Sequence, residues 1–215
     1  MSSQTDPGAH GARAPMSVAA VVLAGGRSRR FGADKLAAEI AGSPLLDRAL
    51  AAALAVAEVV VVVGPDDRPW PSGILIVREH PPFAGPFAAV VAGLEHLSHL
   101  EQPAADDVVL VIAGDLVDPG PQLSALVAAL RTPSATNLAP HQVDAAVTVD
   151  ADGRHQPLLA AYRWGALLDS IAGLNPNGRA AFALLDGLRV LDVPEVGTSA
   201  RDIDTTEDLA RETTR

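Results

Sequence analysis

Five consecutive valines, Val59 to Val63, are followed directly by Gly64-Pro65. A strand with one face in solvent alternates apolar and polar side chains, whereas a strand buried on both faces carries an unbroken β-branched run. Two other apolar runs, Val18 to Leu23 and Val108 to Ile112, also end within two residues of a glycine. The pattern predicts the central strands of a mostly parallel sheet covered on both faces.

Segments with helical periodicity separate these runs. Apolar residues from Leu45 to Leu54 recur at helical spacing, with Ser43 expected as the N-cap and Pro44 as the first helical residue. Helices are also expected at 86–97 and from about 121 to 130. A strand, helix and strand in succession form a βαβ unit with a right-handed crossover. We therefore predict an α/β protein with a three-layer αβα, Rossmann-like fold.

The last third of the chain has a different pattern. A loosely alternating run at 143–149 and a returning run at 156–162 flank the turn signal Asp152-Gly153. This arrangement predicts a hairpin or a mixed edge of the same sheet. Short helical stretches are expected at 164–171 and 179–185.

The run at 18–23 leads into a glycine-rich, basic loop that ends at Lys35. Glycines can take positive φ and bring bare backbone N–H groups against a ligand. Three arginines and a lysine fall within nine residues of a chain whose net charge is −10, which indicates an anionic partner. Lys35 is the only lysine among 16 basic residues. Its compact ammonium can follow a phosphoryl group as charge shifts; the alternative is a solvated loop residue.

The loop pattern Leu-Ala-Gly-Gly-x-Ser-x-Arg-x-Gly-x-Asp-Lys resembles the signature of the nucleotidyltransferases that include molybdenum cofactor guanylyltransferase. The resemblance spans Val18 to about Leu209. It implies contacts to the base and ribose by the first four residues of the pattern, and phosphate contacts by Arg30 and Lys35. Those first four residues are Leu23, Ala24, Gly25 and Gly26.

Asp115 follows a buried strand and a glycine, beyond the carboxyl end of the sheet, where ligands bind in open α/β folds. A carboxylate there can hold a hard cation that itself holds phosphate oxygens. A turn or N-cap aspartate is the alternative. The resemblance implies that Asp115 binds Mg²⁺. The family's proline comes later than usual here, at Pro119, so Asp118 is a candidate to share the role.

The segment from Arg78 to Pro86 resembles the family's base-binding segment, which includes Gly85. Glu79, or carbonyls exposed by the prolines, could accept hydrogen bonds from the N1–H and exocyclic amine of guanine. Such a site rejects an analogue that leaves buried acceptors unpaired. A proline-stiffened turn with Glu79 in solvent is an equally weighted alternative.

Two aspartates near the end, Asp202 and Asp204, flank Ile203 and match the family's Asp or Asn pair. If Ile203 is buried in an extended segment, both carboxylates lie on one face. We expect at least one to bind metal with Asp115. Thr205 with Asp208 also resembles a capping box, which would make this only a capped terminal helix.

Residues 1–15 are rich in Ser, Gly, Ala and Pro and have no apolar core segment, so we expect a disordered extension and no signal peptide. Residues 16–215 are expected to form one domain, with a nucleotide-binding half at 16–131 and an acceptor-side half at 132–215. The chain has no cysteine, which excludes disulfides and thiolate chemistry. Its charge disfavours nucleic acid. No apolar stretch is long enough for a membrane span, so a cytoplasmic protein is expected.

The resemblance implies one reaction: GMP moves from GTP to the terminal phosphate of a molybdopterin-type acceptor, with Mg²⁺ as cofactor and pyrophosphate as product. Transient contact with proteins that deliver or receive the cofactor is a further expectation. Two alternatives stay open. One is a cytidylyl- or other nucleotidyltransferase acting on a related cofactor or a sugar phosphate; the other is a nucleotide-sensing module without turnover.

Overall fold

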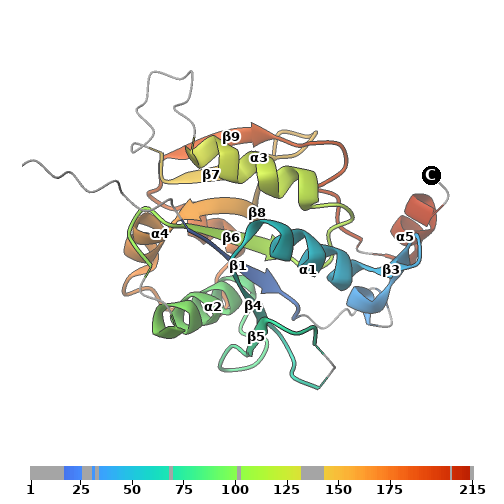
Figure 1. Ribbon diagram of the computed structural model, residues 1–215, viewed down its shortest axis with the longest axis horizontal. Coiled ribbons are helices and arrows are strands. Elements are labelled where there is room, and N and C mark those ends of the chain that lie inside the picture. Colours follow the sequence, from blue (N-terminus) through green and yellow to red (C-terminus); the bar gives the residue numbers. More distant parts are fainter. Residues whose placement is uncertain are drawn as a thin grey trace, which may run out of the picture.

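The computed structural model describes residues 17–25, 31, 34–67, 70–100, 103–131, 143–203 and 205–213. The extension predicted at 1–15 lies outside these residues. Helices cover both faces of a central sheet, so the predicted αβα layers are confirmed (Figure 1).

Seven strands form the central sheet in the order β5-β4-β1-β6-β8-β7-β9. Every neighbouring pair is parallel except the two that involve β8, which runs antiparallel to β6 and β7. The predicted mostly parallel sheet is therefore confirmed, and it is continuous through strands from both predicted halves. The strands are β1 (Val18–Leu23), β4 (Val59–Val63), β5 (Ile74–Val77), β6 (Val108–Ala113), β7 (Ala145–Val149), β8 (His155–Arg163) and β9 (Val190–Pro194).

Two helices pack on each face of the sheet. Helices α1 (Leu45–Val56) and α3 (Gly120–Arg131) bury their apolar stripes against one face. Helices α2 (Pro86–Leu100) and α4 (Trp164–Ile171) cover the other, together with the 3-10 helix η3 (Ala181–Leu185). Strands β1, β4 and β6 contribute side chains to both cores, which explains their unbroken apolar sequences.

The predicted start of the first helix is one residue too early, and the predicted N-cap, Ser43, lies in a strand. Ser43–Pro44 forms strand β3, which pairs with β2 (Glu39–Ile40), and α1 begins only at Leu45. The cause is the turn between them, because Ala41 and Gly42 have φ of 53° and 77°. Two positive φ angles close a two-residue hairpin, and Ser43 is then paired in a strand. The apolar stripe of α1 continues through Ala53, leaving the predicted Leu54 exposed.

Strand β9 was not predicted. It adds in parallel to β7 at the edge of the sheet, and Arg189 just before it forms a bidentate ion pair with Asp144 just before β7. The helix expected at 179–185 is only the short η3. The described residues also form a terminal helix, α5 (Thr206–Thr213), and the 3-10 helix η1 (Lys35–Ala37).

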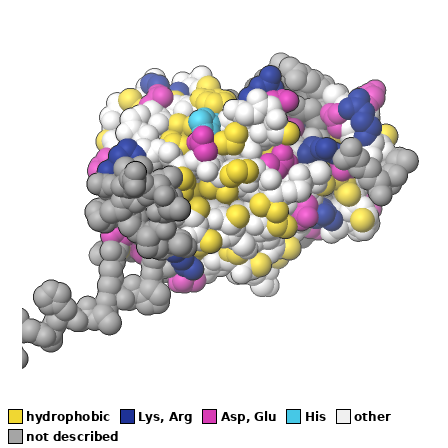
Figure 2. Space-filling model, turned by 90° about the horizontal axis from the view of Figure 1, so that it is seen from above, with side chains coloured by type: hydrophobic (Ala, Val, Ile, Leu, Met, Phe, Trp, Pro, Cys, Tyr) yellow, Lys and Arg dark blue, Asp and Glu magenta, His cyan; other side chains and the backbone are white. Residues whose placement is uncertain are grey.

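Acidic and basic side chains are interspersed with apolar ones on the face above β9 and α3 (Figure 2). Within the described ranges, no helix combines the length and apolarity that a membrane crossing requires.

Candidate active site

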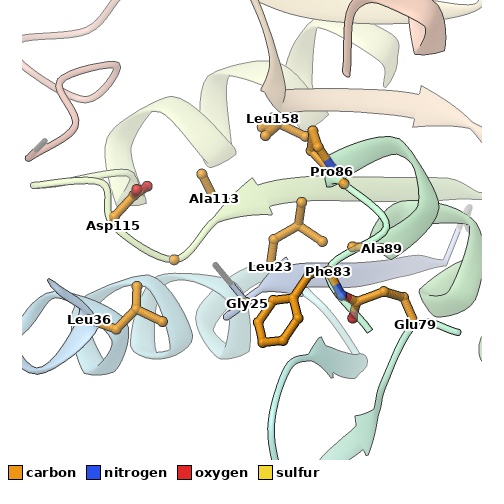
Figure 3. A pocket seen from close by; sticks show the side chains of 12 residues that line it. Leu23, Gly25, Leu36, Glu79, Phe83, Pro86, Ala89, Ala113, Asp115 and Leu158 are labelled. Carbon is orange, nitrogen blue, oxygen red and sulfur yellow. The ribbon is translucent and has the colours of Figure 1, made fainter. Parts of the chain in front are cut away.

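A cavity of about 500 Å³ lies beyond the carboxyl ends of β1 and β6. Asp115 and Leu36 lie at one end of it, and Glu79, Phe83 and Ala89 at the other (Figure 3). The wall comes from five parts of the chain: the end of β1, helix η1, the turn before α2 with the start of that helix, the end of β6, and strand β8. Its residues are Leu23, Gly25, Leu36, Glu79, Phe83, Gly85, Pro86, Ala89, Ala113, Gly114, Asp115 and Leu158.

Lys35 and Asp115 form an ion pair at the first end of the cavity. Lys35 Nζ lies 2.7 Å from Asp115 Oδ2, and Lys35 is only 8% exposed. Helix η1 holds the lysine in place, because the Asp34 carboxylate accepts a hydrogen bond from the Leu36 N–H at its start. The interpretation of Lys35 as a solvated loop residue is therefore wrong. A lysine this buried requires an anionic partner.

Asp115 is positioned by the close approach of two backbones. The N–H of Gly114 donates to the carbonyl of Leu23 over 2.9 Å, and a Cβ at Gly114 would lie 2.7 Å from that oxygen. Only glycine fits between the ends of β1 and β6. Asp115 does not cap α3, which begins at Gly120. Asp118 is exposed and is not among the residues of the cavity wall.

The backbone of Asp202 lies close to the end of the cavity that contains Lys35 and Asp115. It forms an isolated antiparallel bridge with Leu116, and the N–H of Val117 donates to the carbonyl of Arg201 over 3.0 Å. Ile203 is fully buried, as the prediction for this segment required. Asp204, the other predicted ligand, lies outside the described residues.

The capping interpretation of the same segment is confirmed. The N–H of Asp208 donates to Thr205 Oγ1, and Asp208 Oδ2 accepts from the N–H of Thr205 over 3.0 Å. This is a capping box with aspartate in place of glutamate. The capping box uses Thr205 and Asp208, so it does not compete with a role for Asp202.

One or two carboxylates that leave room for water and phosphate oxygens are the protein ligands typical of Mg²⁺. Asp115 on the cavity wall fits that requirement, and the backbone of Asp202 is bridged to Leu116, the residue after Asp115. Within the ranges that the structure describes, no three His, Asp or Glu side chains gather closely enough to hold a metal ion by themselves. The site suits a cation that shares its coordination with a bound phosphate.

Glu79 lies at the other end and is turned inward. It is 9% exposed, and its Oε1 accepts a hydrogen bond from the N–H of Phe83 over 2.9 Å. The alternative that placed Glu79 in solvent is wrong. Gly85 follows with a φ of 106°, and the carbonyl of Ala84 accepts from the N–H of Gly178 over 2.7 Å. Glu79 therefore lines the cavity and also closes the turn that carries Phe83.

The glycine loop is described only in part. Leu23 and Gly25 line the cavity, whereas the N–H of Ala24 is used within the sheet, where it donates to Val63 over 2.8 Å. The predicted Gly26 and Arg30 lie outside the described residues. Sequence reasoning did not single out Phe83, Leu36 or Leu158 as wall residues. An aromatic residue in a proline-rich turn was the available signal for Phe83, because the chain has only four phenylalanines.

Comparison with known proteins gives a consistent family. A family model described as MobA-like NTP transferase domain matches residues 20–189. The chain is 34% identical over 158 residues to a protein of Chloroflexus aggregans named "Probable molybdenum cofactor guanylyltransferase", with 71% of this chain and 68% of the relative covered. It is 43% identical over 105 residues to the 2-C-methyl-D-erythritol 4-phosphate cytidylyltransferase of Xanthomonas campestris pv. campestris, with 44% and 38% covered.

A solved structure has the same fold. The structure of molybdopterin-guanine dinucleotide biosynthesis protein A from Archaeoglobus fulgidus has a TM-score of 0.61 at 20% identity, with 91% of this chain and 97% of that chain covered.

Proposed function

The chain belongs to the family of MobA-like NTP transferase domains and is a nucleotidyltransferase, and on this premise we propose that it is a guanylyltransferase. It transfers GMP from GTP to the terminal phosphate of molybdenum-loaded molybdopterin. An oxygen of that phosphate attacks the α-phosphorus of GTP. The bond from the α-phosphorus to the oxygen that bridges to the β-phosphate breaks, and pyrophosphate leaves with the bonding electrons.

The observation that supports this proposal most directly is the pair between Lys35 Nζ and Asp115 Oδ2 at 2.7 Å. Phosphoryl-type transfers depend on positioning and on neutralisation of developing charge, and need no nucleophilic side chain. In the free protein the two charges neutralise each other. A triphosphate that enters the cavity offers Lys35 a new anionic partner, and Asp115 becomes available to a cation.

Asp115 and Asp202 are the residues that would hold Mg²⁺. The ion, when bound, neutralises charge on the phosphate oxygens. The protein's own part is to place the Lys35 ammonium and the backbone of the glycine loop around the phosphates. Arg30 and Gly26 are proposed to complete that loop, and Asp204 is proposed to assist Asp202.

Guanine is proposed to occupy the end of the cavity formed by the turn before α2. Glu79 Oε1 is engaged by Phe83, so Oε2 remains as an acceptor for the N1–H and exocyclic amine of the base. Gly85 has no side chain to narrow the wall. Reading a base through buried acceptors discriminates against bases that lack the matching donors.

A second candidate is a cytidylyltransferase. The identity of 43% over 105 residues to a cytidylyltransferase favours it. The same phosphate chemistry would serve, and only the contacts to the base would differ.

The test is pyrophosphate release by the purified protein with Mg²⁺ and molybdenum-loaded molybdopterin, in parallel assays with GTP, CTP, ATP and UTP. Product mass is read alongside. Release with GTP and a product that has gained GMP is expected. Release with CTP alone would favour the second candidate, and nucleotide binding without release would favour a sensing module.

Asp115→Asn is the matched variant, because it keeps the shape of the side chain and removes its charge. Turnover is expected to fall by about 10²-fold or more, the scale of losing one electrostatic contact to the transition state. Full turnover by this variant would remove Asp115 from the mechanism.

A further inference from the structure

Phe83 has a backbone and an environment that folding stability does not explain. Its φ is +64°, in the left-handed region that non-glycine residues seldom adopt. Its side chain is large and apolar, yet the residue is 50% exposed at the cavity. A glycine at this position would avoid both costs. Strain of this kind concentrates where a function requires it.

Two neighbours hold Phe83 in this conformation. The buried Glu79 accepts the hydrogen bond from its backbone N–H, which fixes the turn. The guanidinium carbon of Arg78 lies 5.8 Å from the ring centroid, within the range of a cation–π contact. The ring is thus held in a defined place at the cavity.

The surroundings of the ring are apolar. Figure 3 shows Phe83 at the end of the cavity away from Asp115, on the side of Leu23 and Gly25. Pro86, Ala89 and Leu158 line the same cavity. A flat, aromatic group with polar edges fits such an end, and a triphosphate does not. The other end carries the charged pair.

We propose that Phe83 is a base-stacking residue: its ring packs against the face of the bound nucleobase, and Glu79 positions it. The inference rests on the proposed nucleotidyltransferase function. It assigns affinity for the base to Phe83 and selection of the base to other groups of the same site. Every base offers a π face, so stacking on an aromatic ring contributes affinity with little base selectivity. Selection of the base then falls to groups at its edge, including Glu79 Oε2.

The test compares Phe83→Gly and Phe83→Ala with the unaltered protein. Binding of GTP with Mg²⁺ and of inorganic tripolyphosphate with Mg²⁺ is measured by calorimetry. Both variants are expected to bind GTP about tenfold more weakly, the scale found when a stacking aromatic is removed. Tripolyphosphate has no base, so its affinity is expected to stay unchanged.

Phe83→Gly separates the ring from the backbone, because glycine adopts positive φ without strain. Its melting temperature is expected to equal or exceed that of the unaltered protein. Phe182→Ala is the matched control: Phe182 is 57% exposed on η3 and is not part of the cavity wall. This variant is expected to bind both ligands normally.

Three results would overturn the inference. Normal GTP affinity in Phe83→Gly would remove the ring from nucleotide binding. An equal loss of GTP and tripolyphosphate affinity would show a general distortion of the cavity. Failure of the unaltered protein to bind any of the four nucleotides would overturn the proposed function as well. GTP binding that depends on Phe83, without pyrophosphate release, would overturn only the transferase proposal and leave the stacking role standing.

Discussion

The two ends of the cavity are built in different ways. The Lys35–Asp115 end depends on regular elements: η1 carries the lysine, and the aspartate follows β6 after Gly114, which is hydrogen-bonded to the end of β1. The Glu79–Phe83 end depends on an irregular turn with positive φ at Phe83 and Gly85. The first end is a product of the sheet topology, and the second of an irregular turn that packs at the end of the sheet. Chemistry and base recognition should therefore be separable by mutation.

Lys35→Ala is expected to have the largest effect and to act on the first end alone. Loss of the ammonium should lower kcat by about 10²- to 10³-fold, because Lys35 is proposed to neutralise charge that develops in the transition state. GTP affinity should fall much less. Steady-state kinetics with calorimetric binding distinguishes the two quantities. Equal losses in both would show that Lys35 supplies only ground-state affinity.

Gly114→Ala is expected to lower the stability of the fold at the Lys35–Asp115 end. The new Cβ would lie 2.7 Å from the Leu23 carbonyl oxygen and 3.1 Å from Leu46 Cδ1, and overpacking of this kind costs about 1–3 kcal/mol. Urea denaturation measures the loss. Gly120→Ala is the control, because its Cβ would meet Ala52 at an ordinary 3.8 Å. Similar stability of the two variants would contradict the role given to the close approach.

Two variants of Glu79 separate its proposed contact with the base from its hydrogen bond to Phe83. Glu79→Gln keeps a carbonyl oxygen that can accept from the Phe83 N–H, but it replaces the other acceptor by a donor. We expect GTP to lose about tenfold in kcat/KM relative to CTP, the scale of one mismatched hydrogen bond. Glu79→Ala should also weaken binding of every nucleotide, since Phe83 loses its anchor. If Gln and Ala behave alike in the four-nucleotide assay, the carboxylate does not read the base.

The smallest effect is expected outside both ends, at the edge of the sheet. Hydrogen bonds from Arg189 hold the pKa of Asp144 below its ordinary value of 3.8. A lowered folded-state pKa contributes stability above the unfolded value, and this contribution is lost as the pH falls through the folded value. The Arg189→Ala variant should therefore melt at a lower temperature than the unaltered protein at pH 7. At strongly acidic pH the two melting temperatures should converge.

Arg154→Ala is the control for that measurement, because its pair with Asp152 is long, at 3.8 Å, and both side chains are exposed. Exposed pairs contribute little. Turnover and base preference should be unchanged in the Arg189 variant. An altered base preference there would mean that the second end extends to the sheet edge.

Much of the fold could be predicted from the sequence. The runs of β4 and β6 were recognisable because a strand buried on both faces tolerates only apolar residues. Helices α2 and α3 followed from their apolar periodicity. Strand β9 was missed because it is an edge strand of mixed composition, which places weak constraints on its sequence. The β2–β3 hairpin was not predicted because its turn needs a positive φ at Ala41, which alanine seldom adopts.

By itself, the sequence determined the layered fold, the family and the candidacy of Lys35, Asp115 and Glu79, because these depend on local patterns and a long motif. Only the tertiary structure decided that Lys35 pairs with Asp115, that Asp202 lies beside Leu116, and that Glu79 turns inward to hold Phe83. The first two contacts join residues far apart in the chain, where no local pattern specifies distance or orientation. The third depends on how a proline-rich turn packs at the end of the sheet, which the packing of the whole domain fixes.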